Sequence, residues 1–234
     1  MKIPKLTPRL ELLARSVPQG SIAADIGTDH GYLSIWLAAS GVCPTVYASD
    51  VNEGPIARAR DNICKYGLED RVFALRADGL QGVEQKPVTA IIIAGMGGEL
   101  IARILEESSL AKRPEVTLLL QPMTSQPELK AYLCTHGYRV EEERVCREEE
   151  KFYTVLRVRR GTEPHPEEVY RHIGWHVLHS REPQVREYLR FQRRRYARME
   201  EGLEKSGRDE RRLELIRQVL KQLDQVEETW DETK

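Results

Sequence analysis

Short apolar runs alternate with longer mixed segments over residues 21–160. Five of these runs are rich in β-branched residues and are bounded by Gly, Pro or Asp, which is typical of buried strands. They span residues 22–26, 45–49, 72–76, 88–94 and 116–120. Helical patterns fill the segments between them, at residues 32–39, 55–66, 99–107 and 126–136. Strands that alternate with helices predict an α/β fold with a parallel sheet.

The pattern changes after residue 136. Residues 138–143 and 152–159 are two further strand-like runs, joined by a charged connection with no helix between them. Such runs predict an antiparallel hairpin at the end of the sheet. This ending is unusual for a dinucleotide-binding oxidoreductase. We therefore expect a Rossmann-like class I methyltransferase sheet with a terminal antiparallel hairpin.

The C-terminal part, from residue 161 onward, is rich in helix formers, Arg and Glu. Its apolar positions recur at alternating spacings of four and three on both sides of the segment 205–208. They are Val185, Leu189, Gln192, Tyr196, Met199 and Leu203, followed by Leu213, Ile216, Leu220 and Leu223. Two such seams predict an antiparallel helical hairpin of coiled-coil type. A single helical appendage is the alternative. We expect a methyltransferase domain at residues 1–160 and a helical hairpin domain at residues 161–234.

Composition narrows the class of protein only slightly. The 36 Lys and Arg residues nearly balance the 37 acidic residues, which neither demands nor excludes a nucleic-acid partner. The four cysteines contain no C-x-x-C pair, so we expect no disulfide framework and no structural metal. No stretch resembles a signal peptide or a membrane span. We therefore expect a soluble, cytoplasmic protein that does not contact a membrane.

The segment 25–31, D-I-G-T-D-H-G, follows the first predicted strand. In open α/β sheets, ligands bind beyond the carboxyl ends of the strands. Gly27 and Gly31 allow a tight turn and close approach of a ligand to the backbone. The segment departs from G-x-G-x-x-G, and a pyrophosphate would meet the Asp29 carboxylate at close range. S-adenosylmethionine, a sulfonium with a cationic amino-acid end, is therefore the favoured cofactor over NAD.

Acidic residues also follow the second and third predicted strands. Asp50 can accept hydrogen bonds from both ribose hydroxyls, as the corresponding acid does in dinucleotide folds. Asp78 can accept a hydrogen bond from the adenine amino group. Capping of the following helices is the alternative for Asp29, Asp50 and Asp78. The predicted cofactor-binding residues are Asp25, Gly27, Thr28, Gly31, Asp50, Val51, Asp78, Gly79, Gly95 and Met96.

Four strings together carry a family resemblance. They are A-D-I-G-T-D-H-G-Y-L at residues 24–33, S-D-V-N at 49–52, A-G-M-G-G at 94–98 and L-Q-P at 120–122. In this order they resemble the bacterial tRNA (adenine-N1) methyltransferases that act at position 22 in the D-loop. The resemblance covers residues 5–160 by motif and the helical tail by architecture. It implies the fold, S-adenosylmethionine as cofactor and tRNA as substrate. Met123 departs from the family pattern, which has a polar residue there.

The predicted catalytic residues follow from the chemistry of adenine N1. This atom carries a free in-plane lone pair, so no proton must leave before attack, and the product is cationic. Asp29 and then His30 are the candidates for the acidic group near the target, and Gln121 for a hydrogen bond to the base edge. Residues 95–98, G-M-G-G, stand where exocyclic amine methyltransferases place an N-P-P-Y-type motif. That replacement argues against N6 methylation, although a tight strand-to-helix turn also accounts for the glycines.

Residues 181–198 form the densest basic stretch, with seven Arg and two Glu interleaved with aromatic residues. RNA-binding proteins use Arg for phosphate contacts and aromatic or Arg planes for stacking, so this stretch predicts contact with tRNA. A solvated face with salt bridges to Glu200, Glu201 and Glu204 is the alternative. Arg9 belongs to a second basic segment near the expected mouth of the site. The predicted RNA-binding residues are Arg9, Arg190, Arg193, Arg194, Arg195 and Arg198.

Two other functions remain open from the sequence. The first is an NAD-type oxidoreductase, which Asp29 and the terminal hairpin disfavour. The second is a non-catalytic RNA-binding protein that keeps a methyltransferase-like fold. The acids at three strand ends argue against this second alternative.

Overall fold

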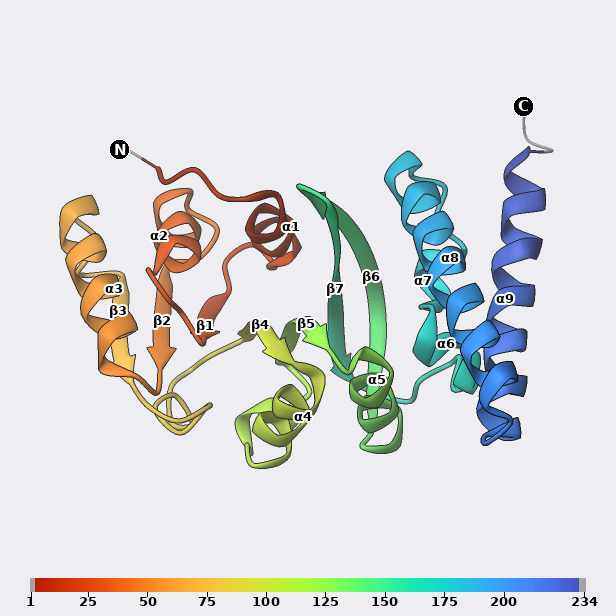
Figure 1. Ribbon diagram of the computed structural model, residues 1–234. Helices are drawn as coiled ribbons and strands as arrows, with labels where there is room; N and C mark the ends of the chain where they lie inside the picture. Colours follow the sequence, from red (N-terminus) through yellow and green to blue (C-terminus); the bar gives the residue numbers. More distant parts are fainter. Residues whose placement is uncertain (1–2, 232–234) are drawn as a thin grey trace. The chain divides into compact units, whose positions relative to one another are not determined.

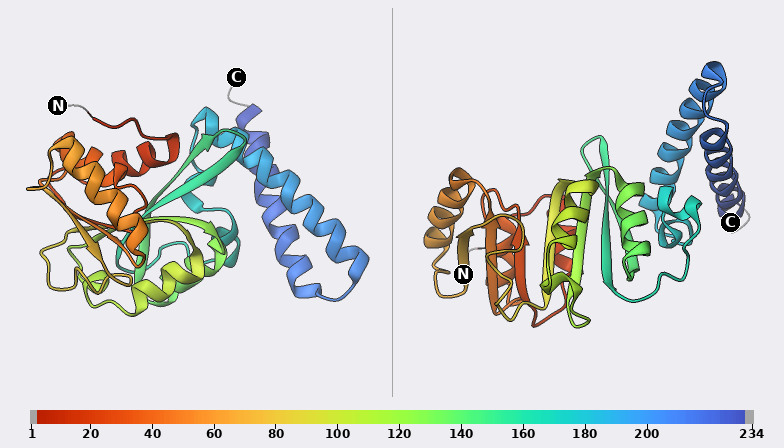
Figure 2. Two further views of the ribbon diagram at one scale, coloured as in Figure 1. Left: turned by 60° about the vertical axis from the view of Figure 1, so that its left-hand side comes forward. Right: turned by 90° about the horizontal axis from the view of Figure 1, so that it is seen from below.

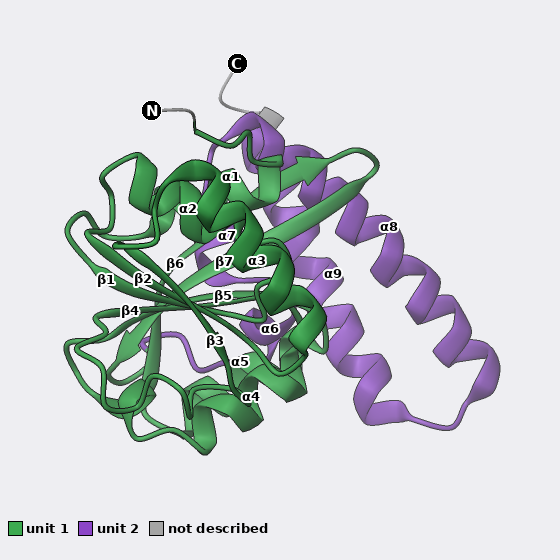
Figure 3. Cartoon of the chain, turned by 90° about the vertical axis from the view of Figure 1, so that its left-hand side faces the viewer, with its two compact units in different colours: residues 1–163 green, residues 164–234 purple. Residues whose placement is uncertain are grey.

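The computed structural model describes residues 3–231 (Figure 1). The chain divides into two compact units, residues 1–163 and residues 164–234 (Figure 3). The strands of the first unit are β1 (Ile22–Ile26), β2 (Thr45–Asp50), β3 (Val72–Arg76), β4 (Ala90–Gly97), β5 (Thr117–Thr124), β6 (Tyr138–Glu148) and β7 (Lys151–Arg160). Its α-helices are α1 (Pro8–Ser16), α2 (Tyr32–Ala39), α3 (Glu53–Tyr66), α4 (Gly98–Glu106) and α5 (Gln126–Thr135), with a short 3₁₀ turn at Leu110–Lys112.

The seven strands form one sheet in the order β3-β2-β1-β4-β5-β7-β6. Each neighbouring pair from β3 to β5 is parallel, whereas β7 runs antiparallel to both β5 and β6. From β1 the chain continues to β2 and β3 on one side of β1, and it then crosses to β4 on the other side. The strand order therefore reverses between β1 and β4. Ligands bind at such a switch point in open α/β sheets. The predicted class I methyltransferase sheet with its terminal hairpin is therefore confirmed.

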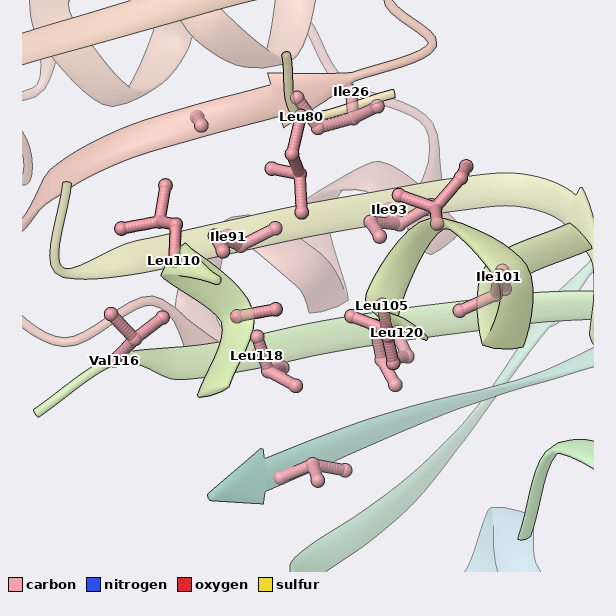
Figure 4. Packing of buried hydrophobic residues seen from close by; sticks show 14 of the residues in the cluster. Ile26, Leu80, Ile91, Ile93, Ile101, Leu105, Leu110, Val116, Leu118 and Leu120 are labelled. Atoms are coloured by element: carbon pink, nitrogen blue, oxygen red, sulfur yellow. The ribbon is translucent and has the colours of Figure 1, made fainter. Parts of the chain in front are cut away.

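Helices cover both faces of this sheet because alternate residues of each strand point to opposite faces. On β4, Ile91 and Ile93 belong to a core with Ile101 of α4, and Figure 4 shows this packing. Ile92 points to the other face, into a core with residues of α1, α2 and α3. The two layers are visible in Figure 1 and in the further views of Figure 2. Burial on both faces explains why the parallel strands are almost continuously apolar.

In the first unit, the observed elements differ from the predicted ones mainly in three places. Helix α1 was not predicted, although Pro8 at its first turn and the spacing of Leu10, Leu13 and Val17 are helix signals. Strands β4 and β5 extend through residues 97 and 124, because residues beyond the apolar runs still pair with a shifted register. The hairpin strands β6 and β7 are longer than predicted, because polar residues near the turn also pair. The predicted strands were too short because the pairing residues at their ends do not belong to an apolar run.

The second unit contains two short helices, α6 (Glu168–His172) and α7 (Trp175–Leu178), and two long ones, α8 (Pro183–Ser206) and α9 (Glu210–Asp231). The long helices form the predicted hairpin. Gly207 ends α8 in the left-handed region, with φ of 59°. The buried seam of α8 includes Val185, Leu189, Gln192 and Tyr196, and that of α9 includes Ile216, Val219, Leu220 and Leu223.

Three other features of the described residues bear on the class of protein. No helix between residues 3 and 231 is long and apolar enough to cross a membrane. No group of three or more His, Cys, Asp or Glu side chains in the same range is arranged to hold a metal ion. All four cysteines are free, and burial raises the pKa of the Cys43 thiol to about 12 and that of Cys146 to about 11.

Candidate functional site

A cleft of about 350 Å³ opens at the carboxyl ends of β1 and β4, where the strand order reverses. Its volume lies in the range of small-molecule sites. The lining residues are Arg9, Leu10, Asp25, Gly27, Thr28, Asp29, His30, Gly31, Tyr32, Leu33, Ala94 and Gly95. Seven of the predicted site residues from the glycine loop and the end of β4 thus share one cleft with Arg9.

The glycine loop is shaped by backbone geometry that a larger residue would disturb. Gly27 has φ of +81°, and a Cβ placed there would lie 2.2 Å from the Met96 methyl carbon. Gly31 has φ of +71°, and a Cβ there would meet Ala59 at 3.3 Å. The Ser49 carbonyl of β2 accepts hydrogen bonds from the Gly27 and Thr28 amides at 2.7 and 3.0 Å. The loop is therefore fixed to β2 with its backbone open to the cleft.

Asp25 lies near the carboxyl end of β1 and is only 5% exposed. The Ser34 hydroxyl of α2 donates a hydrogen bond to its carboxylate at 2.7 Å. Burial raises the pKa of Asp25, and the side chains of Ser34 and Thr28 lower it in part. A buried carboxylate beside a cleft is suited to hold a cationic group of a ligand, since such a group would replace the water that the carboxylate has lost.

Asp29 lies in the same loop but in a different environment, because its carboxylate is exposed. The Arg58 guanidinium of α3 contacts one carboxylate oxygen at 2.6 Å, and the His30 imidazole contacts the other at 3.1 Å. His30 in turn stacks on the Tyr32 ring, with ring centroids 5.6 Å apart. The structure thus places two of the three predicted catalytic residues, Asp29 and His30, together, and Arg58 orients the Asp29 carboxylate.

Asp50 is the last residue of β2 and Asp78 follows β3, at the same edge of the sheet but outside the residues that line the cleft. The Asp50 carboxylate accepts a hydrogen bond from the Asn52 amide at 2.7 Å. The Val51 side chain is 52% exposed. Asp78 is exposed and Gly79 follows it with φ of +52°.

The helix-capping alternative for the three acids finds no support. The N-cap residues of α2 and α3 are Gly31 and Asn52, and neither helix has a side-chain cap hydrogen bond. No α-helix follows Asp78 in the described chain before α4. The acids therefore do not serve as N-caps.

Gln121 is fully buried on β5, and its amide is engaged within the chain. Its Oε1 accepts hydrogen bonds from the Gly95 amide at 3.1 Å and from the Arg9 guanidinium at 3.2 Å. Its Nε2 donates to the Pro122 carbonyl at 3.1 Å. These contacts tie the ends of β4 and β5 to helix α1.

The predicted RNA-binding arginines of α8 fall into two sets. Arg190 contacts Glu227 of α9, and Arg193 contacts Asp224, each at 2.5 Å. Arg195 donates a hydrogen bond to Gln192 and lies over the Tyr196 ring. Within residues 3–231, the side chains of Arg194 and Arg198 form no hydrogen bond or ion pair. The sequence stretch therefore contains one set of arginines that pairs with acidic residues of α9 and another set that does not.

Three residues of the site were not predicted. Ser34 holds Asp25, Arg58 holds Asp29, and the Tyr153 ring lies 5.2 Å from the Arg9 guanidinium. Ser34 carried a signal, since it is a polar residue inside the apolar segment 32–39. Arg58 and Tyr153 carried none, because their contacts join elements far apart in the chain.

Comparison with known proteins identifies relatives of the first unit of the chain. Residues 6–156 match the family model described as a methyltransferase domain. The tRNA (adenine(22)-N(1))-methyltransferase of Bacillus subtilis is 34% identical over 152 residues, which are 65% of this chain and 64% of that protein. The chain thus aligns with slightly less than two thirds of this curated relative.

Two solved structures are similar over both units. One is the Streptococcus pneumoniae protein assigned as a tRNA (m1A22) methyltransferase, in complex with S-adenosyl-L-methionine. It is 32% identical, covers 95% of this chain and 99% of its own, and has a TM-score of 0.81. The other is the Bacillus subtilis m1A22 tRNA methyltransferase, which is 25% identical, covers 95% and 98% of the two chains, and has a TM-score of 0.78.

Proposed function

Because this chain belongs to the methyltransferase domain family, we propose that it transfers the methyl group of S-adenosylmethionine to N1 of adenine 22 in the D-loop of tRNA. The observation that carries the proposal is the 34% identity with a tRNA (adenine(22)-N(1))-methyltransferase. The similarity of both units to the Streptococcus pneumoniae protein supports it further. An NAD-type oxidoreductase is not favoured, because the matched family and relatives are methyltransferases.

The cleft residues fit S-adenosylmethionine. Gly27 and Gly31 line the cleft without side chains, and Asp25 offers a buried carboxylate to the ammonium group of the methionine end. Asp50 accepts hydrogen bonds from the ribose, the exposed Val51 side chain provides an apolar surface for the adenine ring, and Asp78 accepts from its amino group. When bound, the cofactor supplies an activated methyl group with a good leaving group.

The protein therefore contributes mainly by positioning, which can supply roughly 7–11 kcal/mol of the barrier. Adenine N1 attacks with its own lone pair, and positive charge then develops on the base. The Asp29 carboxylate, oriented by Arg58 and His30, stabilises that charge or accepts a proton from the exocyclic amine. Since N1 lies on the Watson–Crick edge, the base must leave its stack, which costs a few kcal/mol.

The helical unit contacts the tRNA through one face of α8. Phe191, Arg194, Arg195 and Arg198 are spaced at three, four and seven residues, so they lie on the same side of the helix. Phe191 is 40% exposed and the three arginines are exposed. This face combines cations for phosphates with planar groups for stacking. The units thus divide the work, with residues 1–160 for catalysis and residues 161–234 for RNA contact, in the cytoplasm where tRNA is processed.

Methyl transfer to an unmodified tRNA transcript tests the proposal. The protein is incubated with labelled S-adenosylmethionine and the transcript, and the nucleosides are then analysed by mass spectrometry. We expect 1-methyladenosine, and none from a matched transcript with guanosine at position 22. Label on another nucleoside, or equal 1-methyladenosine from both transcripts, would overturn the proposed specificity.

A further inference from the structure

Arg9 reaches the cleft from helix α1. Its guanidinium donates a hydrogen bond to Gln121 Oε1 at 3.2 Å and lies 3.6 Å from the Met123 sulfur. The Tyr153 ring packs against the same guanidinium, whose carbon lies 5.2 Å from the ring centroid. A neutral amide and an aromatic ring therefore hold the cation in place without neutralising it.

No acidic side chain among residues 3–231 forms an ion pair with this guanidinium. The nearby Glu148 carboxylate accepts a hydrogen bond from the main-chain amide of Arg9 instead, at 3.0 Å. The Arg9 Nε atom is buried and has no hydrogen-bond partner in the described chain. A partly buried cation with an unused donor is costly unless a ligand pairs with it.

The charges of the cleft indicate what that ligand is. Among the described residues that line it, Arg9 is the sole Lys or Arg, whereas Asp25 and Asp29 are both acidic. A zwitterionic amino-acid end needs one group of each sign. Asp25 can receive its ammonium, and Arg9 stands beside Gly95, with a guanidinium nitrogen 3.7 Å from the position of a Cβ at that glycine.

We propose that Arg9 is the oxyanion-binding group of the cleft. Its partner is the carboxylate of the cofactor's methionine moiety or the phosphate of the target nucleotide, which share the chemistry that a guanidinium recognises. Gln121 is a positioning residue for Arg9, because its Oε1 joins the guanidinium to the Gly95 amide. The identity of both ligands rests on the proposed function.

Calorimetric titration of the full chain distinguishes the carboxylate from other partners. S-adenosylmethionine and its decarboxylated analogue are each titrated into the wild type, Arg9→Gln, Arg9→Lys and the control Arg15→Gln. Arg15 lies on the same helix but is exposed and pairs with Glu11. If the carboxylate is the partner, Arg9→Gln weakens S-adenosylmethionine about 10- to 100-fold. The decarboxylated analogue then binds the wild type and Arg9→Gln with equal affinity. The affinity of Arg9→Lys for S-adenosylmethionine lies between those of the wild type and Arg9→Gln.

A tRNA titration tests the phosphate. If phosphate is the partner, Arg9→Gln leaves cofactor affinity unchanged, weakens tRNA binding and lowers its salt slope by about 0.7–0.9. Gln121→Ala is expected to weaken binding of the same ligand as Arg9→Gln does, whether that ligand is the cofactor or tRNA, but by a smaller factor. If Arg9→Gln weakened the binding of S-adenosylmethionine and of the analogue equally, Arg9 would have a merely structural role and the proposal would be overturned. No change in either the cofactor or the tRNA titration would also overturn it. Absence of tRNA methylation by the wild type would refute the proposed function and leave the cofactor titration decisive for Arg9.

Discussion

One ion pair of the first unit and a pair of contacts in the second unit differ strongly in their exposure to water. In the first unit, Lys130 of α5 and Glu143 of β6 form an ion pair whose side chains are 6% and 2% exposed. In the second unit, Arg217 of α9 contacts Glu200 and Glu204 of α8, and all three side chains are at least 28% exposed. Water and salt screen the second kind of pair but hardly reach the first.

This difference shows that the density of charged residues along the chain does not predict whether a charged side chain pairs within the protein or lines the cleft. The arginine-rich segment of α8 contains residues such as Arg190 and Arg193, which pair with α9. Arg9, from a less densely charged segment, lies instead in the wall of the cleft. A charge matters most where solvent is excluded or where no protein group neutralises it.

The largest expected change in stability comes from a substitution that breaks the buried ion pair between Lys130 and Glu143. Lys130→Met leaves Glu143 buried without its cation, although Gln126 still donates to it at 3.0 Å. We expect the free energy of unfolding to fall by about 3–5 kcal/mol, measured by urea denaturation. The double variant Lys130→Met/Glu143→Gln should recover much of this loss, because it buries no unpaired charge. A loss below about 1 kcal/mol for the single variant would contradict the comparison.

The next effect separates binding from stability in the cleft. Because burial raises the pKa of Asp25, its contribution to stability is present below its ordinary pKa of 3.8 and is lost as pH rises through the folded-state value. At pH 7, Asp25→Asn should therefore raise the melting temperature, by about 2–4 °C if it gains about 1 kcal/mol. It should weaken S-adenosylmethionine about 10- to 100-fold. Denaturation curves at pH 4 and pH 7 measure the change in stability, and calorimetry measures the change in cofactor affinity. A stability gain of Asp25→Asn that is greater at pH 4 than at pH 7 would refute the raised pKa of Asp25.

A third effect separates the two sets of arginines on α8. Changing Arg194, Arg195 and Arg198 together to Gln should weaken tRNA binding and lower its salt slope by about 2–3, since each lost phosphate contact removes about 0.7–0.9. The matched control changes Arg190 and Arg193 to Gln, and it should leave the salt slope nearly unchanged. Filter binding at several salt concentrations measures both. A reversed order of the two variants would place the RNA contact on the α9-facing side.

The smallest effect concerns the exposed pairs of the hairpin. Arg217→Gln removes contacts with Glu200 and Glu204, yet we expect it to change the free energy of unfolding by at most about 1 kcal/mol. Added salt should reduce this difference further. Urea denaturation at low and high salt measures it, and a loss comparable to that of Lys130→Met would show that the two units do not differ in this way.

The sequence by itself determined the order of strands and helices, the terminal hairpin and the helical tail. These features depend on local periodicity, on β-branched runs and on the turn residues that bound them, all of which can be read within a short window. The glycine loop was equally readable, because Gly27 and Gly31 mark backbone conformations that other residues disfavour. Helix α1 had the same kind of local signal, from Pro8 and its apolar spacing, and could have been predicted.

Only the tertiary structure decided which charges are paired. Arg9 and Gln121 are 112 positions apart, and nothing in either segment indicates that one holds the other. Likewise, whether Arg193 or Arg194 meets an acid depends on how α8 and α9 are aligned, and neighbouring residues of a helix point about 100° apart. The energy of a charge depends on its partners and its distance from water, and both are properties of the folded chain.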